Sequence, residues 1–159
     1  MARVVVPGYP HHITQRGNRK QEVFFCDSDY RAYMRMVAKE KERACVEIWA
    51  YCLMPNHWHL LLWPERDGDL GRFMQRLTGT HVRRWQGLGG RVGLGHVYQD
   101  RYRSFPVETD EHFLAVARYV ERNALRANLV TRAEEWQWSS LWRRRSKDEK
   151  VRACLHEGP

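Results

Sequence analysis

Two histidines separated by one residue are the first feature of this sequence that suggests chemistry. His57 and His59 lie in the apolar stretch MPNHWHLLL, residues 54–62. In a β-strand, residues i and i+2 point to the same face, so both imidazoles would project side by side with Trp58 on the other face. Such a pair can bind a divalent ion, but a histidine in a strand can also be satisfied by a hydrogen bond alone. The spacing leaves both interpretations open.

A third ligand for such an ion would have to come from another part of the chain. The stretch RYVERN places Tyr119 and Asn123 four residues apart, on one face of a predicted helix. The cysteines lack the spacing of a zinc site, and the HExxH motif is absent. A tyrosine at the border of a buried helix stripe can also pack its ring and leave its hydroxyl in water, so this pair alone does not define a site.

The hydrophobic periodicity predicts the elements that must position these residues. Alternating apolar residues predict strands over residues 11–18 (including a turn), 46–53, 57–63 and 98–107. Helical spacing predicts helices over about 28–44, 70–86 and 110–125. This β-α-β-β-α-β-α order favours an α+β fold, a ferredoxin-like antiparallel sheet with helices packed on it. The helix that carries Tyr119 must then lie across the sheet face that carries the histidines.

The composition indicates a folded, basic protein. The chain has 159 residues, of which 43% are hydrophobic and 12% aromatic, which argues against disorder and predicts a domain with its own core. Its formal net charge of +8 favours a polyanion as partner, although basic enzymes and ribosome-associated proteins share this property. We find no signal peptide, no apolar run long enough for a membrane span and no secreted cysteine framework, so we expect a cytoplasmic protein.

Several groups of polar residues could contact nucleic acid. One arc of the second predicted helix carries arginines that form either a phosphate-facing stripe or an ordinary solvated face. The C-terminal tail places Trp136, Trp138 and Trp142 beside arginines, so the tryptophans either stack on bases or dock on the core. We therefore predict a domain over residues 1–135 and a basic, tryptophan-rich tail over 136–159.

The candidate DNA-contacting residues fall into two classes. Arginines are expected to contact phosphates, and polar residues of the first strand and turn can reach base edges or else serve the turn's own hydrogen bonds. The phosphate class comprises Arg72, Arg76, Arg83, Arg101, Arg103, Arg143, Arg144 and Arg145, and the base-reading class comprises Thr14, Arg16 and Asn18.

Five blocks of the sequence stand in the order of one family: GYPHHITQRGNRKQEVFF, AYCLMPNHWHLLL, VYQDRYRSF, ARYVERNALRANLV and WQWSS. Over residues 9–141 the chain resembles REP-associated tyrosine transposases, of the IS200-like, single-tyrosine HUH superfamily. The resemblance implies an HUH nuclease fold that cleaves and joins single-stranded DNA beside hairpins. By position it implies His57, His59 and Asn123 as metal ligands and Tyr119 as the nucleophile.

This chain departs from the usual family sequence at two places. Residues 123–128 read Asn-Ala-Leu-Arg-Ala-Asn where the family usually has Asn-Pro-Val-Arg-Ala-Gly, and Trp58 stands where a small residue is common. Proline and glycine mark helix boundaries, so the first departure could move the end of the helix that carries Tyr119.

We therefore expect a metal-dependent DNA transesterase, a transposase that forms a covalent phosphotyrosine and uses Mg²⁺ or Mn²⁺. The alternatives are a non-catalytic DNA-binding regulator of the same fold and a replication initiator. Initiators commonly carry a helicase domain, for which 159 residues leave no room. We expect single-stranded or hairpin DNA as partner, no membrane, a monomer with a dimer as the alternative, and a nucleoid-associated location in the cytoplasm.

Overall fold

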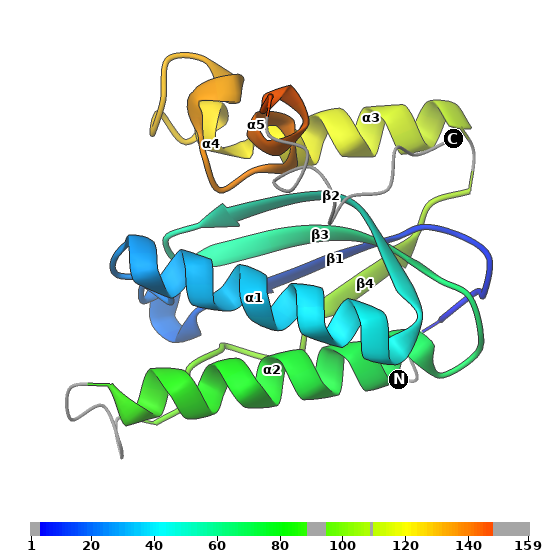
Figure 1. Cartoon of the computed structure of the whole chain (residues 1–159), viewed down its shortest axis with the longest axis horizontal. Helices are drawn as coiled ribbons and strands as arrows, with labels where there is room; N and C mark the ends of the chain where they lie inside the picture. The colour runs from blue at the N-terminus through cyan, green and yellow to red at the C-terminus, as the bar shows by residue number, and fades with distance from the viewer. Residues whose placement is uncertain (1–3, 89–94, 109, 148–159) are drawn as a thin grey trace.

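A four-stranded antiparallel sheet forms the centre of the protein (Figure 1). The computed structural model describes residues 4–88, 95–108 and 110–147. The strands are β1 (His11–Arg16), β2 (Val46–Met54), β3 (His57–Pro64) and β4 (Arg103–Pro106), and they stand side by side in the order β2-β3-β1-β4. β3 and β1 are therefore the central strands, and β2 and β4 form the two edges.

Helices cover both faces of this sheet. α1 (Asp27–Ala44) and α2 (Asp69–Gly87) lie on one face, and α3 (Asp110–Glu121), α4 (Asn123–Arg126) and α5 (Ser140–Arg145) lie on the other (Figure 1). Short 3-10 helices, η1 (Asn18–Lys20) and η2 (Ala133–Glu135), lie in the connections. Element order and strand order confirm the predicted ferredoxin-like α+β fold. None of the helices in the described part of the chain is long and apolar enough to cross a membrane.

Side chains of the central strands point alternately to the two faces of the sheet, and a separate hydrophobic core lies on each face. Ile13, Trp58 and Leu60 are buried in the larger core, on the side of α1 and α2. Leu61 points to the opposite face and is buried beside Val120 of α3 in the smaller core. Full burial of such a side chain contributes about 1.5–3 kcal/mol. A shift of register by one residue would exchange the two sets, so the pattern fixes which face carries the histidines.

Two predicted elements differ from the structure. The strand predicted over residues 98–107 begins only at Arg103, because Tyr98 is buried in the larger core and meets Gly17 through an isolated bridge. The helix predicted over 110–125 is divided at Arg122 into α3 and α4. The Arg122 amide still donates to the Arg118 carbonyl, so the helical spacing continues across the division.

The segment that follows α4 packs on the edge strand β2. The Leu53 amide donates to the Trp138 carbonyl at 2.8 Å, and the Trp138 ring stacks on Tyr30 with 4.8 Å between ring centroids. Trp136 also packs against the core, whereas Trp142 on α5 is 37% exposed. Docking on the core therefore accounts for Trp136 and Trp138, which is one of the two roles considered for the tail.

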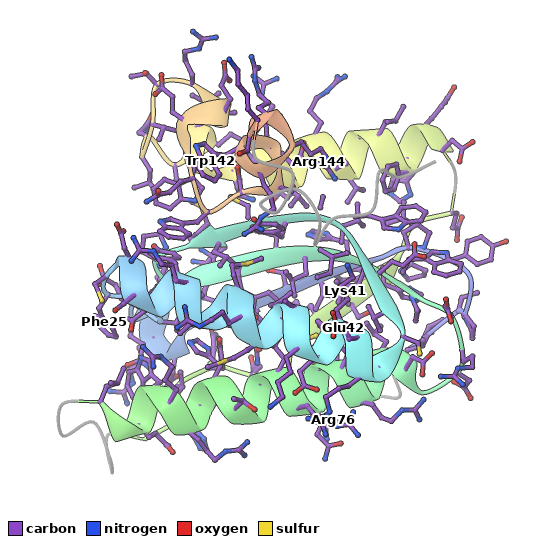
Figure 2. The ribbon with its side chains drawn as sticks, in the orientation of Figure 1. Phe25, Lys41, Glu42, Arg76, Trp142 and Arg144 are labelled. Atoms are coloured by element: carbon purple, nitrogen blue, oxygen red, sulfur yellow. The ribbon has the colours of Figure 1, made fainter. Side chains whose placement is uncertain are left out.

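Contacts with α3 hold α5 in place. The Ser140 hydroxyl donates to the Glu121 carboxylate at 2.6 Å, and the Arg144 guanidinium forms an ion pair with the same carboxylate. Figure 2 shows Arg144 beside α3. Of the predicted tail, residues 148–159 lie outside the described part, and the division at residue 135 stays a prediction.

A buried hydrogen-bond chain crosses the larger core. The Trp58 indole donates to the Tyr98 hydroxyl at 3.0 Å, and that hydroxyl lies 2.5 Å from Nδ1 of His81 on α2. A hydroxyl that accepts from the indole can donate to a neutral imidazole, so the chain is satisfied when His81 is uncharged. Burial lowers the pKa of His81 to about 4, although the nearby charge of Asp29 acts to raise it.

His81 should therefore link stability to pH. An unfolded histidine titrates near pH 6.5, so between about pH 6.5 and 4 the unfolded chain binds a proton at His81 that the folded protein does not. The free energy of unfolding should fall with decreasing pH in this window, by up to about 1.4 kcal/mol per pH unit from this residue. In urea denaturation, the free energy of unfolding of His81→Asn should depend less steeply on pH than that of the wild type. Asparagine keeps a hydrogen-bond acceptor for the Tyr98 hydroxyl.

A matched control is His96→Asn, because His96 is exposed. This variant keeps the buried hydrogen-bond chain and should have the wild-type free energy of unfolding at pH 7. Equal slopes for the wild type and His81→Asn would contradict the role assigned to His81.

Candidate active site

Strand β3 presents His57 and His59 to the sheet face that α3 covers. Trp58, between them, is buried in the opposite core, as the alternation predicts. The two imidazole rings have centroids 5.2 Å apart and planes at 82°. His59 is 6% exposed, and His57 is half-buried. A central strand therefore holds the two rings at a fixed spacing.

The helices α3 and α4 place Tyr119 and Asn123 beside the two histidines. Tyr119 is 43% exposed, and its ring lies edge-on to His59, with ring centroids 5.7 Å apart. Asn123 begins α4 and is buried, and its side-chain nitrogen has no hydrogen-bond partner within the described residues. Side chains from β3, α3 and α4 thus meet although they are far apart in the sequence.

Both histidines are neutral at pH 7. Burial lowers the pKa of His59 to about 3 and that of His57 to about 4. The charge of Arg16 lowers the pKa of His57 further, whereas a hydrogen bond with the Asn123 side chain raises it. For His59, nearby imidazoles and two arginines act in the same direction as burial. Each ring therefore keeps a nitrogen lone pair at physiological pH.

Both rings have a hydrogen-bond partner at Nδ1, and His57 also interacts with the Asn123 side chain. Nδ1 of His57 lies 2.7 Å from Oδ1 of Asn56, and Nδ1 of His59 lies 2.9 Å from Nε2 of His12. The described residues contain no cluster of three His, Cys, Asp or Glu side chains that could hold an ion, and Asn123 contributes an amide beside His57. Neutral imidazoles and an amide oxygen fit a divalent ion.

A basic groove of about 270 Å³ lies beside the Tyr119 ring. Tyr119 and His59 line it together with four of the residues predicted to contact DNA, which are Thr14, Arg16, Arg101 and Arg103. A second groove, of about 740 Å³, runs between α2 and residues 95–102. Both grooves are lined by Gln15, Gln99, Asp100 and Arg101, so they meet along this part of the chain.

Comparison with known proteins places this site in a family. Residues 6–123 match the family described as transposase IS200-like. The chain belongs to the IS200-like transposases. The matched region ends at Asn123 and includes both histidines and Tyr119, so the whole candidate site lies within it.

Two solved structures resemble this transposase-family chain. One is a REP-associated tyrosine transposase bound to a REP hairpin, with a TM-score of 0.76, 18% identity, and coverage of 100% of this chain and 89% of that one. The other is a candidate transposase from Deinococcus radiodurans R1, with a TM-score of 0.52, 18% identity, and coverage of 77% and 95%. At this identity the likeness shows the fold, which is the HUH nuclease fold that we predicted. Comparison with curated protein sequences gave no match.

Other residues predicted to contact DNA lie away from the Tyr119 groove of this IS200-like transposase. Arg72, Arg76 and Arg83 belong to α2, in the layer opposite α3, and Arg76 lies on the outer side of that helix (Figure 2). Arg72 forms an ion pair with Asp69 at 2.5 Å. Asn18 lies in η1 and does not line the groove. The structure does not bring these residues to the candidate site.

The three arginines of α5 differ in their surroundings. Arg143 donates from Nε to the Tyr51 hydroxyl at 2.7 Å, and Arg144 bonds to Glu121 and to a backbone carbonyl of β2. The Arg145 side chain is 63% exposed and lies 3.9 Å from a carboxylate. Arg143 and Arg144 therefore bond within the protein, which leaves Arg145 as the most accessible of the three.

Two residues near Tyr119 were not predicted from the sequence. The Arg126 guanidinium lies 4.2 Å from the centre of the Tyr119 ring. It follows Tyr119 by seven residues and Asn123 by three, so helical spacing alone could have placed it on the same face. His12 meets His59 through the register of β1 against β3, which no local pattern reveals.

The end of α4 explains how this chain accommodates its departure from the usual family sequence. Asn128, where the family usually has glycine, adopts a left-handed φ of 59°. Its amide donates to the Leu125 carbonyl, and the Leu129 amide donates to the Ala124 carbonyl, both at 3.0 Å. This pair of bonds is a Schellman motif, and asparagine is tolerated at its left-handed position. The helix therefore ends one turn after Asn123.

Substitution of Arg103 and of Arg76 tests which basic surface contacts DNA. An arginine that contacts a phosphate should, when neutralised, weaken binding and reduce the slope of log affinity against log salt by about one unit. Because Arg103 lines the Tyr119 groove, Arg103→Gln should show this loss with a labelled single-stranded oligonucleotide. Arg76→Gln is the matched control on the opposite layer and should keep the wild-type slope. The reverse result would place the DNA on α2.

Proposed function

We propose that this protein cleaves and joins single-stranded DNA beside hairpins, with Tyr119 as the nucleophile. The observation that supports this most directly is the exposed Tyr119 ring, which stands edge-on to His59 in a groove lined by arginines. Hairpin DNA is proposed as the partner because a structurally similar transposase is bound to a REP hairpin. The groove could accept a single strand next to such a hairpin.

The proposed reaction is a transesterification. The Tyr119 oxygen attacks the phosphorus, a Tyr–O–P bond forms, and the bond from phosphorus to the leaving oxygen of the DNA breaks. The phenol proton is balanced by the proton that the leaving oxygen acquires as it becomes a free hydroxyl. A DNA hydroxyl that attacks the phosphotyrosine reverses the step, so joining needs no nucleotide cofactor.

The proposed metal ligands are Nε2 of His57, Nε2 of His59 and the amide oxygen of Asn123. A bound Mg²⁺ or Mn²⁺ would polarise the scissile phosphate and stabilise the negative charge that develops on it. Burial keeps both imidazoles neutral at pH 7, so protons do not compete for these nitrogens. The Asn123 amide already lies within hydrogen-bond reach of His57, and its side-chain nitrogen has no partner within the described residues.

Arginines provide the positive charge around the proposed phosphate position. Arg126 lies over the Tyr119 ring, and a cation at that distance contributes about 0.5–2 kcal/mol to holding the ring. No ion pair found in the described part of the chain includes Arg126, so its charge is available to a phosphate. Arg16, Arg101 and Arg103 line the groove beside it.

The decisive test is a covalent protein–DNA adduct. Incubation with a labelled hairpin oligonucleotide and Mn²⁺ should give a shifted band on a denaturing gel. Tyr119→Phe should abolish this band yet bind the hairpin nearly as well, because it loses one oxygen. His57→Ala and His59→Ala should abolish both the band and Mn²⁺ binding. Asn123→Ala should have a milder effect that high Mn²⁺ partly reverses.

Tyr9→Phe is a matched control for this experiment. Tyr9 is 45% exposed, much like Tyr119 at 43%, so the substitution has a similar effect on the surface. It should leave the adduct unchanged. An adduct from Tyr119→Phe would assign the nucleophile to another tyrosine. Hairpin binding by the wild type without any adduct would favour the non-catalytic DNA-binding regulator.

We also propose that one chain acts alone, on DNA at the nucleoid. Tyr119 and His59 of the same chain are already neighbours, so a second chain need not supply the tyrosine. The edge of β2 is occupied by the Trp138 carbonyl and by the Ser140 hydroxyl, which accepts from the Tyr51 amide at 2.9 Å. The other edge strand, β4, is four residues long and ends in proline. Neither edge favours extension of the sheet by a second copy.

Mixing two inactive variants tests this arrangement. If each site takes both parts from one chain, Tyr119→Phe and His59→Ala should stay inactive when mixed, because neither contains a complete site. Recovery of the adduct in the mixture would show that the tyrosine is supplied by a partner. Light scattering over a range of concentrations should give the monomer mass.

A further inference from the structure

His12 meets His59 across the two central strands. Nε2 of His12 lies 2.9 Å from Nδ1 of His59, and the two rings are close to parallel, at 15° with centroids 5.2 Å apart. In the register of β1 and β3, His12 pairs with Leu61 and Thr14 pairs with His59. His12 is thus the diagonal neighbour of His59 on the same sheet face, so the backbone itself brings the rings together.

A single proton lies between these two nitrogens, and its position decides what His59 can do. If His59 carries the proton on Nδ1 and donates it to His12, Nε2 of His59 keeps a lone pair. If His12 donates instead, the His59 proton lies on Nε2 and that nitrogen cannot bind a metal ion. Ring nitrogens that bind metals are commonly oriented in the first way, by an acceptor on the other nitrogen.

We propose that His12 is a positioning residue that accepts the Nδ1 proton of His59 and so keeps Nε2 of His59 free for the ion. This inference rests on the proposed function, since it concerns the same metal site. His12 would not touch the ion or the DNA phosphate. It would act through the tautomer and the orientation of the His59 ring.

His57 shows the same arrangement with a different acceptor. Nδ1 of His57 lies 2.7 Å from Oδ1 of Asn56. The orientation of that amide is supported by its other end, because Nδ2 of Asn56 donates to the Lys20 carbonyl at 3.3 Å. Both histidines of β3 therefore have an acceptor at Nδ1, one from the preceding residue and one from the neighbouring strand.

Nitrogen NMR of the protein without metal or DNA tests the tautomer directly. Long-range ¹H–¹⁵N spectra of histidine-labelled wild type should show His59 protonated on Nδ1 and unprotonated on Nε2. The opposite tautomer in the wild type would overturn the proposal. This measurement requires no variant, so it decides the question even where a substitution prevents folding.

Two substitutions then test the consequence for the ion. His12→Leu removes the acceptor and should give a mixture of His59 tautomers and a Mn²⁺ affinity about 10- to 100-fold lower by calorimetry. His12→Gln restores an acceptor oxygen and should recover most of that affinity. The tautomer of His57 should be the same in every variant. An unchanged His59 tautomer and Mn²⁺ affinity in His12→Leu would overturn the role of His12.

The outcome is separable from that of the proposed reaction. A wild type with the expected His59 tautomer that forms no DNA adduct would remove the proposed catalytic function and leave the positioning role of His12 standing. A wild type that forms the adduct but has His59 protonated on Nε2 would support the catalytic function and remove the positioning role of His12.

Discussion

Burial of both faces of β3 is the constraint on which the rest of this structure depends. A central strand of a sheet with helices on each side has no solvent face, so every side chain must suit one of two cores. Trp58 enters the larger core, and the flanking histidines enter the margin of the smaller one. Loss of hydration there disfavours the charged imidazolium. The same burial that forms the fold therefore keeps both imidazoles uncharged.

Local periodicity explains why much of the fold and the centre of the site could be predicted from the sequence. The alternation around Trp58 gives the shared face of His57 and His59, and the helical spacing gives the shared face of Tyr119 and Asn123. Each relation involves residues only two or four positions apart in the sequence. The order of elements then restricts the topology to few arrangements, of which the ferredoxin-like one is observed.

Relations between elements explain what the sequence could not predict. The contact between His12 and His59 depends on strand register. The sequence indicated the arc of arginines on α2, but it could not indicate on which face of the sheet α2 packs. The predicted strand over residues 98–107 is shortened because Tyr98 is buried and bonds to Trp58 and His81, and such tertiary contacts override local β-propensity.

The bond between Trp58 and Tyr98 also bears on how the protein meets its ligand. Tyr98 directly precedes Gln99, Asp100 and Arg101, which line the groove beside Tyr119, and Trp58 belongs to the strand that carries the histidines. Core packing therefore sets the position of this side of the groove relative to the reactive residues before any DNA arrives. The entropy of ordering this part of the groove is lost during folding and not again on association. Selection among strands would then follow from how well each fits a preformed shape, with little adjustment by the protein.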